Sequence, residues 1–194
     1  IIINLTVVTI ADASDTESTV TVDPNAIANN GTDTSTISIT LKSADGQLIK
    51  NAPLSQIQVT ATDTSGGNIY GTLTEIGNGL YQVTLASTVS EIKTVTVKLD
   101  KDGDATFETT LEDTPTVLVY DPNANADATQ TICTINPAIQ STTPGQQSTI
   151  TVQLKDAFGI PLSGKAAYFT IESTGTGNTI GTLTETATLG TYTT

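Results

Sequence analysis

The residues whose types and spacing could do chemistry lie in the acidic run Asp100-Lys101-Asp102-Gly103-Asp104. Carboxylates at the first, third and fifth positions open an EF-hand calcium loop, where their oxygens ligate the ion. The run departs from that loop at Ala105, where the turn calls for Gly, and at Leu111, where a bidentate Glu should close the site. The pattern therefore favours an acidic hairpin turn. The alternative is a calcium site formed by Asp100, Asp102 and Asp104 and completed by Glu108, Glu112 or Asp113.

The 194-residue chain contains no His, no Trp and one Cys, which removes several kinds of catalytic site. Without His, Ser–His and Cys–His nucleophiles and zinc sites of the His/Cys type are excluded. A carboxylate pair for glycoside hydrolysis remains formally possible. Aromatic residues make up only 4% of the chain, however, so no aromatic-lined sugar cleft is implied. We predict that the chain is not an enzyme, and Ca²⁺ is the one cofactor that the sequence leaves open.

The charge of the chain excludes further classes of partner. The formal net charge is −13, and all seven cationic residues are Lys. Nucleic-acid binding needs clustered cations, and a polybasic membrane contact needs them too. We therefore expect no nucleic-acid partner and no membrane insertion. Lys residues near strand ends could join Asn or Asp side chains in intramolecular isopeptide bonds, although the sequence alone picks out no such triad.

Two segments of the chain occur twice. Residues 35–42 (STISITLK) return at 148–155 (STITVQLK), and residues 68–75 (NIYGTLTE) return at 178–185 (NTIGTLTE). A repeat of this length indicates tandem modules. Thr is abundant, and short runs of alternating apolar and polar residues are separated by Gly, Asn and Asp turns, a pattern typical of strands. The sequence predicts an all-β protein of two tandem immunoglobulin-like β-sandwiches, the second incomplete in this chain.

The predicted organisation has four parts, given by residue number: an N-terminal strand and linker (1–17), domain 1 (18–120), a linker (121–128) and domain 2 (129–194). Domain 2 lacks its last strands, because nothing corresponds to residues 84–111. Either the chain continues beyond Thr194 or another strand fills the gap, and 1–10 is a candidate donor. Carboxylates near the predicted linkers offer a second calcium option: Asp12, Asp15, Glu17, Asp121 and Asp127.

One motif of the second repeat carries a family resemblance. Asp156-Ala157-Phe158-Gly159-Ile160-Pro161-Leu162-Ser163-Gly164 resembles the motif of group 1 bacterial Ig-like domains from invasin- and intimin-type surface proteins. In the first repeat, Ser43 replaces the Asp and Pro53 is displaced. The resemblance covers most of the chain and implies an extracellular stalk that projects a binding tip. Cys133 aligns with Val20, and we expect it to be a small buried residue in the first strand.

These observations predict stalk or spacer repeats of a bacterial cell-surface or secreted adhesin-like protein, located outside the cell. The partners would be neighbouring Ig-like modules or identical subunits. Two alternatives remain open. One is a filament-forming subunit, completed by donor-strand exchange of residues 1–10. The other is an Ig-like binding or decoration module that recognises a glycan or a host protein through its loops.

Overall fold

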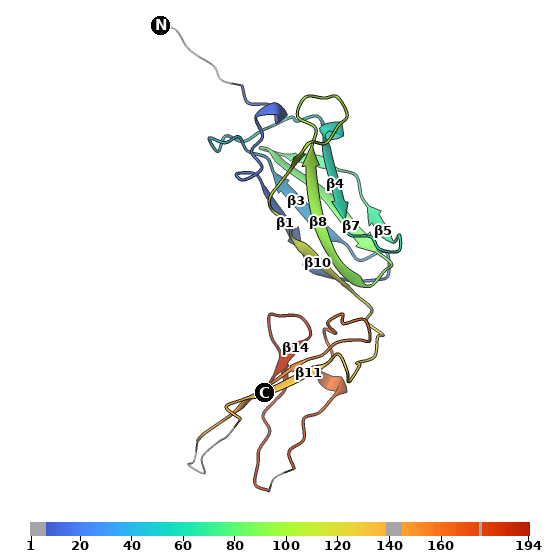
Figure 1. Cartoon of the computed structure of the whole chain (residues 1–194), viewed down its shortest axis with the longest axis vertical. Helices are drawn as coiled ribbons and strands as arrows, with labels where there is room; N and C mark the ends of the chain where they lie inside the picture. The colour runs from blue at the N-terminus through green and yellow to red at the C-terminus, as the bar shows by residue number, and fades with distance from the viewer. Residues whose placement is uncertain (1–6, 139–144, 175) are drawn as a thin grey trace. The chain divides into compact units, whose positions relative to one another are not determined.

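The computed structural model describes residues 7–138, 145–174 and 176–194. The chain divides into two compact units, unit 1 and unit 2, between Val119 and Tyr120. Strands are the main regular elements of both units, and the helical segments are single turns (Figure 1). The predicted all-β class is confirmed. Within the described ranges, no helix is long and apolar enough to cross a membrane.

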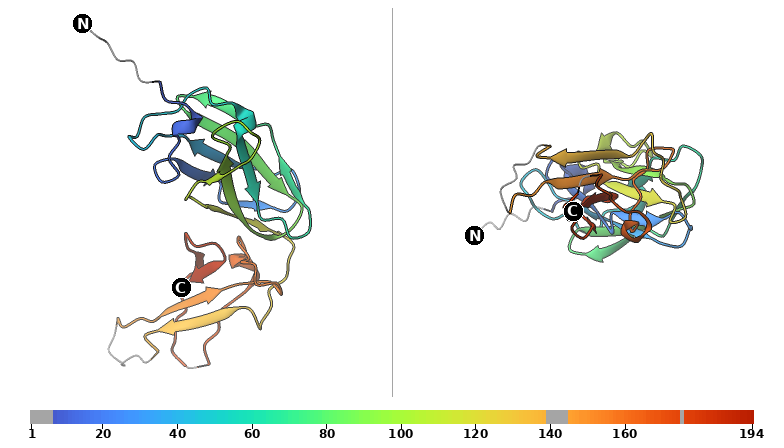
Figure 2. Two further views of the ribbon diagram at one scale, coloured as in Figure 1. Left: turned by 45° about the horizontal axis from the view of Figure 1, so that its top comes forward. Right: turned by 90° about the horizontal axis from the view of Figure 1, so that it is seen from below.

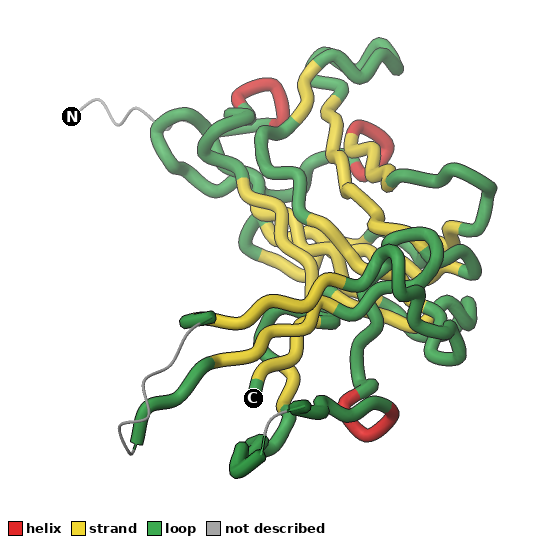
Figure 3. The backbone as a smooth tube through the Cα atoms, turned by 60° about the horizontal axis from the view of Figure 1, so that its bottom comes forward, coloured by secondary structure: helices red, strands yellow, loops and turns green. Residues whose placement is uncertain are grey.

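Unit 1 is a sandwich of two five-stranded sheets. The first sheet contains, in spatial order, β1 (Thr19–Asp23), β3 (Ser35–Thr40), β7 (Leu80–Ser87) and β5 (Asn68–Tyr70), with β6 (Thr74–Gly77) also paired to β7. The second contains, in spatial order, β2 (Ala26–Ala28), β10 (Thr116–Tyr120), β8 (Glu91–Leu99) and β4 (Ile57–Ala61), with β9 (Thr109–Thr110) also paired to β8. Figure 3 shows these strands in yellow.

The core of unit 1 lies between the two sheets and is aliphatic. In β3 the side chains alternate, so that Ile37 and Ile39 are fully buried while their neighbours are partly exposed. In β8 the same alternation buries Val95, Val97 and Leu99. Period-two alternation places these side chains on the one face of each sheet that meets the other sheet.

The segment before β1 is packed against unit 1. Ile10, in the 3-10 turn η1 (Ile10–Asp12), and Ala13 both lie in the hydrophobic core of the unit. These residues fall within the predicted N-terminal strand and linker. Two hydrogen bonds join this segment and the start of β1 to the segment before β10: Glu112 N–H donates to the Asp15 carbonyl at 3.1 Å, and Val20 N–H, in β1, donates to Asp113 Oδ2 at 3.0 Å. Residues 1–6 of the candidate donor lie outside the described residues.

Unit 2 contains one four-stranded sheet, with the spatial order β11 (Ile132–Asn136), β12 (Thr149–Gln153), β14 (Thr191–Thr193) and β13 (Thr184–Glu185). By their pairing, these strands correspond to β1, β3, β7 and β6 of unit 1. Figure 2 shows the strands of unit 2 in yellow-orange to red. The described residues of unit 2 form no counterpart of the second sheet. A small core forms around Tyr192, whose ring meets Phe169 edge to face at 5.2 Å between centroids. The prediction of an incomplete second sandwich is confirmed.

The burial of Cys133 predicted from the sequence is wrong. Cys133 is exposed, whereas its counterpart Val20 is buried in the core of unit 1. The two residues hold the same place in the ladder, since Val20 pairs with Ile39 and Cys133 with Val152. What differs is whether a second sheet covers the first strand. In unit 1 the second sheet lies over β1, and in unit 2 every residue of β11 is exposed.

Candidate functional site

The predicted acidic run forms the turn between β8 and β9. Asp100 is buried and closes this turn, because its Oδ1 accepts Gly103 N–H at 2.7 Å and its Oδ2 accepts Ala105 N–H at 2.9 Å. Gly103 and Ala105 both have positive φ, 82° and 70°. Ala105 therefore adopts a conformation that usually favours Gly. The carboxylate of Asp100 offsets that strain by fixing both N–H groups.

Three carboxylates of the acidic turn come close enough to share a cation. Oxygens of Asp100, Asp102 and Glu108 lie within 4.8 Å of one another. Asp104 is not part of this group. Its Oδ1 instead accepts Thr106 N–H at 2.7 Å. Glu108 takes the third place and also accepts Lys101 N–H at 2.8 Å. Calcium binding stays a prediction, now with Glu108 in place of Asp104.

Three of the five carboxylates near the predicted linkers, Asp12, Asp121 and Asp127, cap local turns. Asp12 Oδ2 accepts the N–H and hydroxyl of Thr9. Asp127 Oδ1 accepts the hydroxyl and N–H of Thr129 and the N–H of Gln130. The Thr129 hydroxyl and N–H stabilise the anion and lower the pKa of the Asp127 carboxyl. Within the described residues, none of these three carboxylates belongs to a group of three that could hold a metal.

A buried lysine cluster, formed by Lys93, Glu91 and Asp63, lies at the other end of β8. The Lys93 side chain is fully buried, and its Nζ hydrogen-bonds Glu91 Oε1 and lies 3.6 Å from Asp63 Oδ1. Glu91 Oε2 accepts the Thr64 hydroxyl at 2.7 Å. Burial would raise the pKa of the Glu91 carboxyl, but the hydrogen bonds from Lys93 and Thr64 outweigh it and lower the pKa. Sequence reasoning missed this cluster.

The same hydrogen-bonded arrangement, here called the tyrosine lock, occurs in both units. In unit 1 the hydroxyl of buried Tyr81 donates to the Ile49 carbonyl at 3.0 Å and accepts Ala52 N–H at 2.9 Å. In unit 2 the hydroxyl of Tyr192 donates to the Leu162 carbonyl at 2.6 Å and accepts Lys165 N–H at 2.9 Å. Each lock fixes the loop that carries the family motif, here called the motif loop (residues 43–53 in unit 1 and 156–165 in unit 2), against the strand that holds the tyrosine, β7 or β14.

The environment of the two lock phenols is also repeated. A carboxylate lies near each hydroxyl, Glu75 in unit 1 and Glu185 in unit 2. Burial raises the pKa of both phenols, the backbone N–H bond partly offsets it, and the carboxylate adds to the rise. Each carboxylate also accepts backbone N–H from the motif loop, from Asn51 at 3.1 Å and from Gly164 at 2.8 Å. Both donors have positive φ.

The turn at the start of the motif shows why the first repeat tolerates its departure. In unit 2 Asp156 Oδ1 accepts the N–H groups of Phe158 and Ile160, both at 2.9 Å. In unit 1 Ser43 Oγ accepts Gln47 N–H at 3.2 Å. The backbone bonds of the two turns also match, so a hydroxyl replaces the carboxylate with one hydrogen bond fewer.

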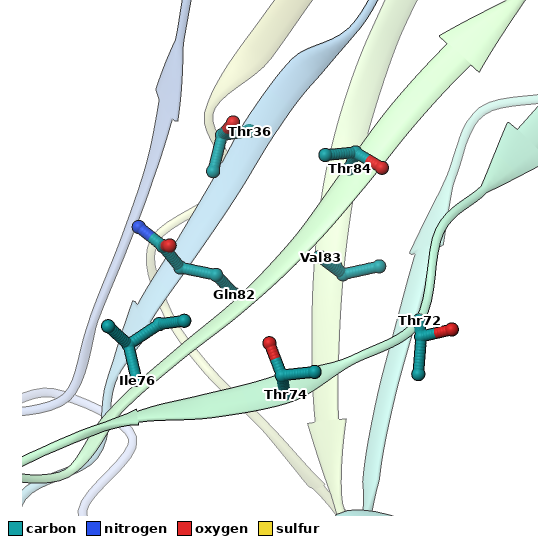
Figure 4. A pocket seen from close by; sticks show the side chains of 7 residues that line it. All are labelled: Thr36, Thr72, Thr74, Ile76, Gln82, Val83 and Thr84. Atoms are coloured by element: carbon teal, nitrogen blue, oxygen red, sulfur yellow. The ribbon is translucent and has the colours of Figure 1, made fainter.

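A groove on the first sheet of unit 1 offers no charged group. Figure 4 shows the side chains that line it, which come from β3, β6, β7 and the segment before β6: Thr36, Thr72, Thr74, Ile76, Gln82, Val83 and Thr84. Gln82 Nε2 donates to Ser38 Oγ at 2.9 Å. Hydroxyls and methyl groups could hold a neutral polar ligand, but this lining contains neither an acid nor a base.

Comparison with known proteins gives one family match. Residues 14–117, more than half of the chain, match the family model described as "Invasin, domain 3". No curated protein matches the chain.

Three adhesins are among the similar solved structures. Yersinia pseudotuberculosis adhesin InvE is 25% identical, with a TM-score of 0.46, and the match covers 76% of this chain and 36% of that one. Escherichia coli adhesin FdeC is 21% identical, with a TM-score of 0.44, and the match covers 93% of this chain and 55% of that one. Invasin, described as a bacterial integrin-binding protein, is 25% identical, with a TM-score of 0.47, and the match covers 93% of this chain and 34% of that one. The chain thus spans about a third to a half of these structures.

Proposed function

This chain belongs to the invasin domain 3 family, and on that premise we propose that it supplies stalk modules of a bacterial cell-surface or secreted adhesin. Its work is to space and orient other parts of the adhesin outside the cell. It acts without catalysis. Its immediate partners are the Ig-like modules on either side of it.

The observation that carries this proposal is the repeated tyrosine lock. Each unit ties its motif loop to its own central strand through one buried phenol. The turn before the first strand is repeated as well, since Lys42 N–H donates to Ser18 Oγ at 3.0 Å and Lys155 N–H donates to Thr131 Oγ1 at 3.2 Å. Modules that are fixed internally by the same bonds suit a stalk, because its span depends on folded units.

Module exchange in the full-length surface protein tests the stalk function. Unit 1 is replaced by an unrelated Ig-like domain of equal length, and adhesion of the bacteria to host cells is measured. A spacer predicts unchanged adhesion, whereas simple deletion of unit 1 shortens the stalk and weakens it. Loss of adhesion after the exchange would identify unit 1 as a binding module for a glycan or a host protein.

A second candidate function is filament assembly, and the open face of unit 2 favours it. On this face β11 presents Cys133 and Ile135, both exposed, at the places that Val20 and Val22 hold in unit 1. A strand from a neighbouring subunit could cover it by β-augmentation. The donated segment would have to end before Ile10, which is buried in its own unit. Deletion of residues 1–9 should then leave only monomers, and polymers that persist after the deletion would refute this function.

A further inference from the structure

The buried lysine cluster brings together the three groups that amide formation needs. Lys93 lies on the core face of β8, next to Val95 and across the ladder from Val117, all three fully buried. Its amine meets two carboxylates, one on its own strand and one in the segment that follows β4. A charged amine is costly to bury even when paired. A condensation that removes the charge from both Lys93 and one acid would relieve that cost.

We propose that Lys93 and Asp63 become joined by an intramolecular isopeptide bond, with Glu91 as the proton carrier. Glu91 takes a proton from the Lys93 ammonium, and the neutral amine attacks Cγ of Asp63. The Nζ–Cγ bond forms and one Cγ–O bond breaks. The departing oxygen leaves as water with two protons from the amine, one of them carried by Glu91. The amide keeps one proton on Nζ, and Glu91 ends as a carboxylate.

The surroundings distinguish the roles of the two carboxylates. Glu91 lies two residues from Lys93 on the same strand and accepts the Thr64 hydroxyl at 2.7 Å, so it is held as a hydrogen-bond acceptor. Asp63 Oδ1, the oxygen 3.6 Å from Nζ, accepts Gly67 N–H at 2.9 Å. That N–H is placed to stabilise negative charge on this oxygen when the amine adds. Asp63 is therefore assigned as the acyl donor.

The fold supplies the proximity that the condensation requires. Asp63 lies two residues beyond the end of β4, which pairs with β8 up to Ala61 opposite Val95. The ladder therefore holds Asp63 beside Lys93. Fixed neighbours react as if at very high concentration, which offsets the unfavourable condensation in water. Gly67 fits its place closely, because a Cβ there would lie 2.6 Å from Val89 Cγ2. The bond would covalently tie the edge strand β4 to the central strand β8.

The first measurement is the intact mass of the folded full chain. The bond makes this mass lower than the sequence mass by one water. Trypsin does not cleave after an acylated Lys, so the peptide expected is 51–98 less one water, in place of 51–93. Succinimides at Asp45-Gly46 and Asp102-Gly103 also lose water, but they lie outside this peptide and hydrolyse in mild base.

Two variants test the assigned roles, and a third is the control. In Asp63→Asn the leaving group is ammonia, so the mass deficit should change from one water to one ammonia. In Glu91→Gln the proton carrier is lost with little change of shape, and the deficit should disappear. Lys98→Arg, on the same strand, should keep the loss of one water.

The proposal is overturned if the folded wild-type chain has its full sequence mass and trypsin cleaves it after Lys93. It is also overturned if Asp63→Ala retains the loss of water within residues 51–98. The wild-type measurement needs no variant, so a variant that fails to fold leaves the test intact. An ion pair alone produces neither a mass deficit nor resistance to trypsin at Lys93.

Discussion

Unit 1 and unit 2 share four strands of the first sheet and the same tyrosine lock, but among the described residues a second sheet covers these strands in unit 1 alone. The same two lock hydrogen bonds form in both units, whereas Val20 is buried and its counterpart Cys133 is exposed. The difference separates two levels of organisation. The lock depends on local loop geometry and forms without the second sheet, while burial of the first strand depends on that sheet.

The largest expected effect comes from emptying the matched core positions. Ile37 is fully buried, and its counterpart Ile150 is only partly buried. We expect Ile37→Ala to lower the free energy of unfolding by about 2–5 kcal/mol and Ile150→Ala by about half as much or less. Amide hydrogen exchange reports the two units separately. Equal losses would mean that another strand covers unit 2 in solution.

Removal of the lock hydroxyls should affect both units alike. Tyr81→Phe and Tyr192→Phe each leave a buried carbonyl and an N–H, buried at Ala52 and partly buried at Lys165, without their partner, at a cost of about 1–3 kcal/mol. A much smaller loss in unit 2 would show that its lock needs the missing sheet. Hydrogen exchange, measured on both variants in increasing denaturant, gives the cost for each unit separately.

The lock phenols also predict a pH dependence. Their pKa in the folded state is raised above the ordinary 10.0. Their contribution to stability is therefore complete below pH 10 and is lost as pH rises through the folded-state pKa. Each Tyr→Phe variant should show a flatter alkaline decline than the wild type. Unfolding midpoints measured between neutral and strongly alkaline pH test this sign.

The turn that opens each motif gives a smaller difference. Asp156→Ala removes two hydrogen bonds to a carboxylate, for which we expect a loss of about 2 kcal/mol, and Ser43→Ala removes one to a hydroxyl, for about 1 kcal/mol. Ser43→Asp should stabilise unit 1, because it restores the second acceptor. Thermal unfolding of the three variants is the measurement. A destabilising Ser43→Asp would show that the two turns are not interchangeable.

Cys133 tests the open face directly. Cys133→Ala should change the free energy of unfolding by about 0.5 kcal/mol or less, as expected of an exposed side chain. A maleimide should label Cys133 in the folded chain, whereas Val20→Cys in the Cys133→Ala background should be labelled only on unfolding. Protection of Cys133 would contradict an open face.

Of the changes considered, calcium should alter the difference in stability between the two units least. The acidic turn belongs to unit 1, and a weak site made by Asp100, Asp102 and Glu108 would raise its free energy of unfolding by on the order of 1 kcal/mol at about ten times Kd. Glu108→Gln should abolish that rise. Identical melting curves in excess calcium and in EDTA would show that the predicted calcium site is wrong.

The repeat and the alternation of apolar residues predicted the fold, because strand pairing follows period two and turn chemistry follows Gly and Asp. The acidic hairpin turn was predicted, with Glu108 as one of three residues that could complete a calcium site, but the grouping of Glu108 with Asp100 and Asp102 in place of Asp104 depends on how the chain folds back through Ala105. The burial of Lys93 could have been predicted from the alternation along its strand, since Lys93 lies on the same face as Val95 and Val97. Its acid partner Asp63 belongs to another strand's end, and only the β4–β8 register reveals it.

The hydrogen bonds between residues 15–20 and 112–113 have a mechanical consequence. The backbone of Asp15 and of Val20 is bonded directly to the segment that leads into β10. A pull on the two ends of unit 1 would therefore act first on these two bonds, before it reached the ladders of either sheet. These two bonds would resist the separation of β1 from the segment that leads into β10, and the core would stay in place until they broke.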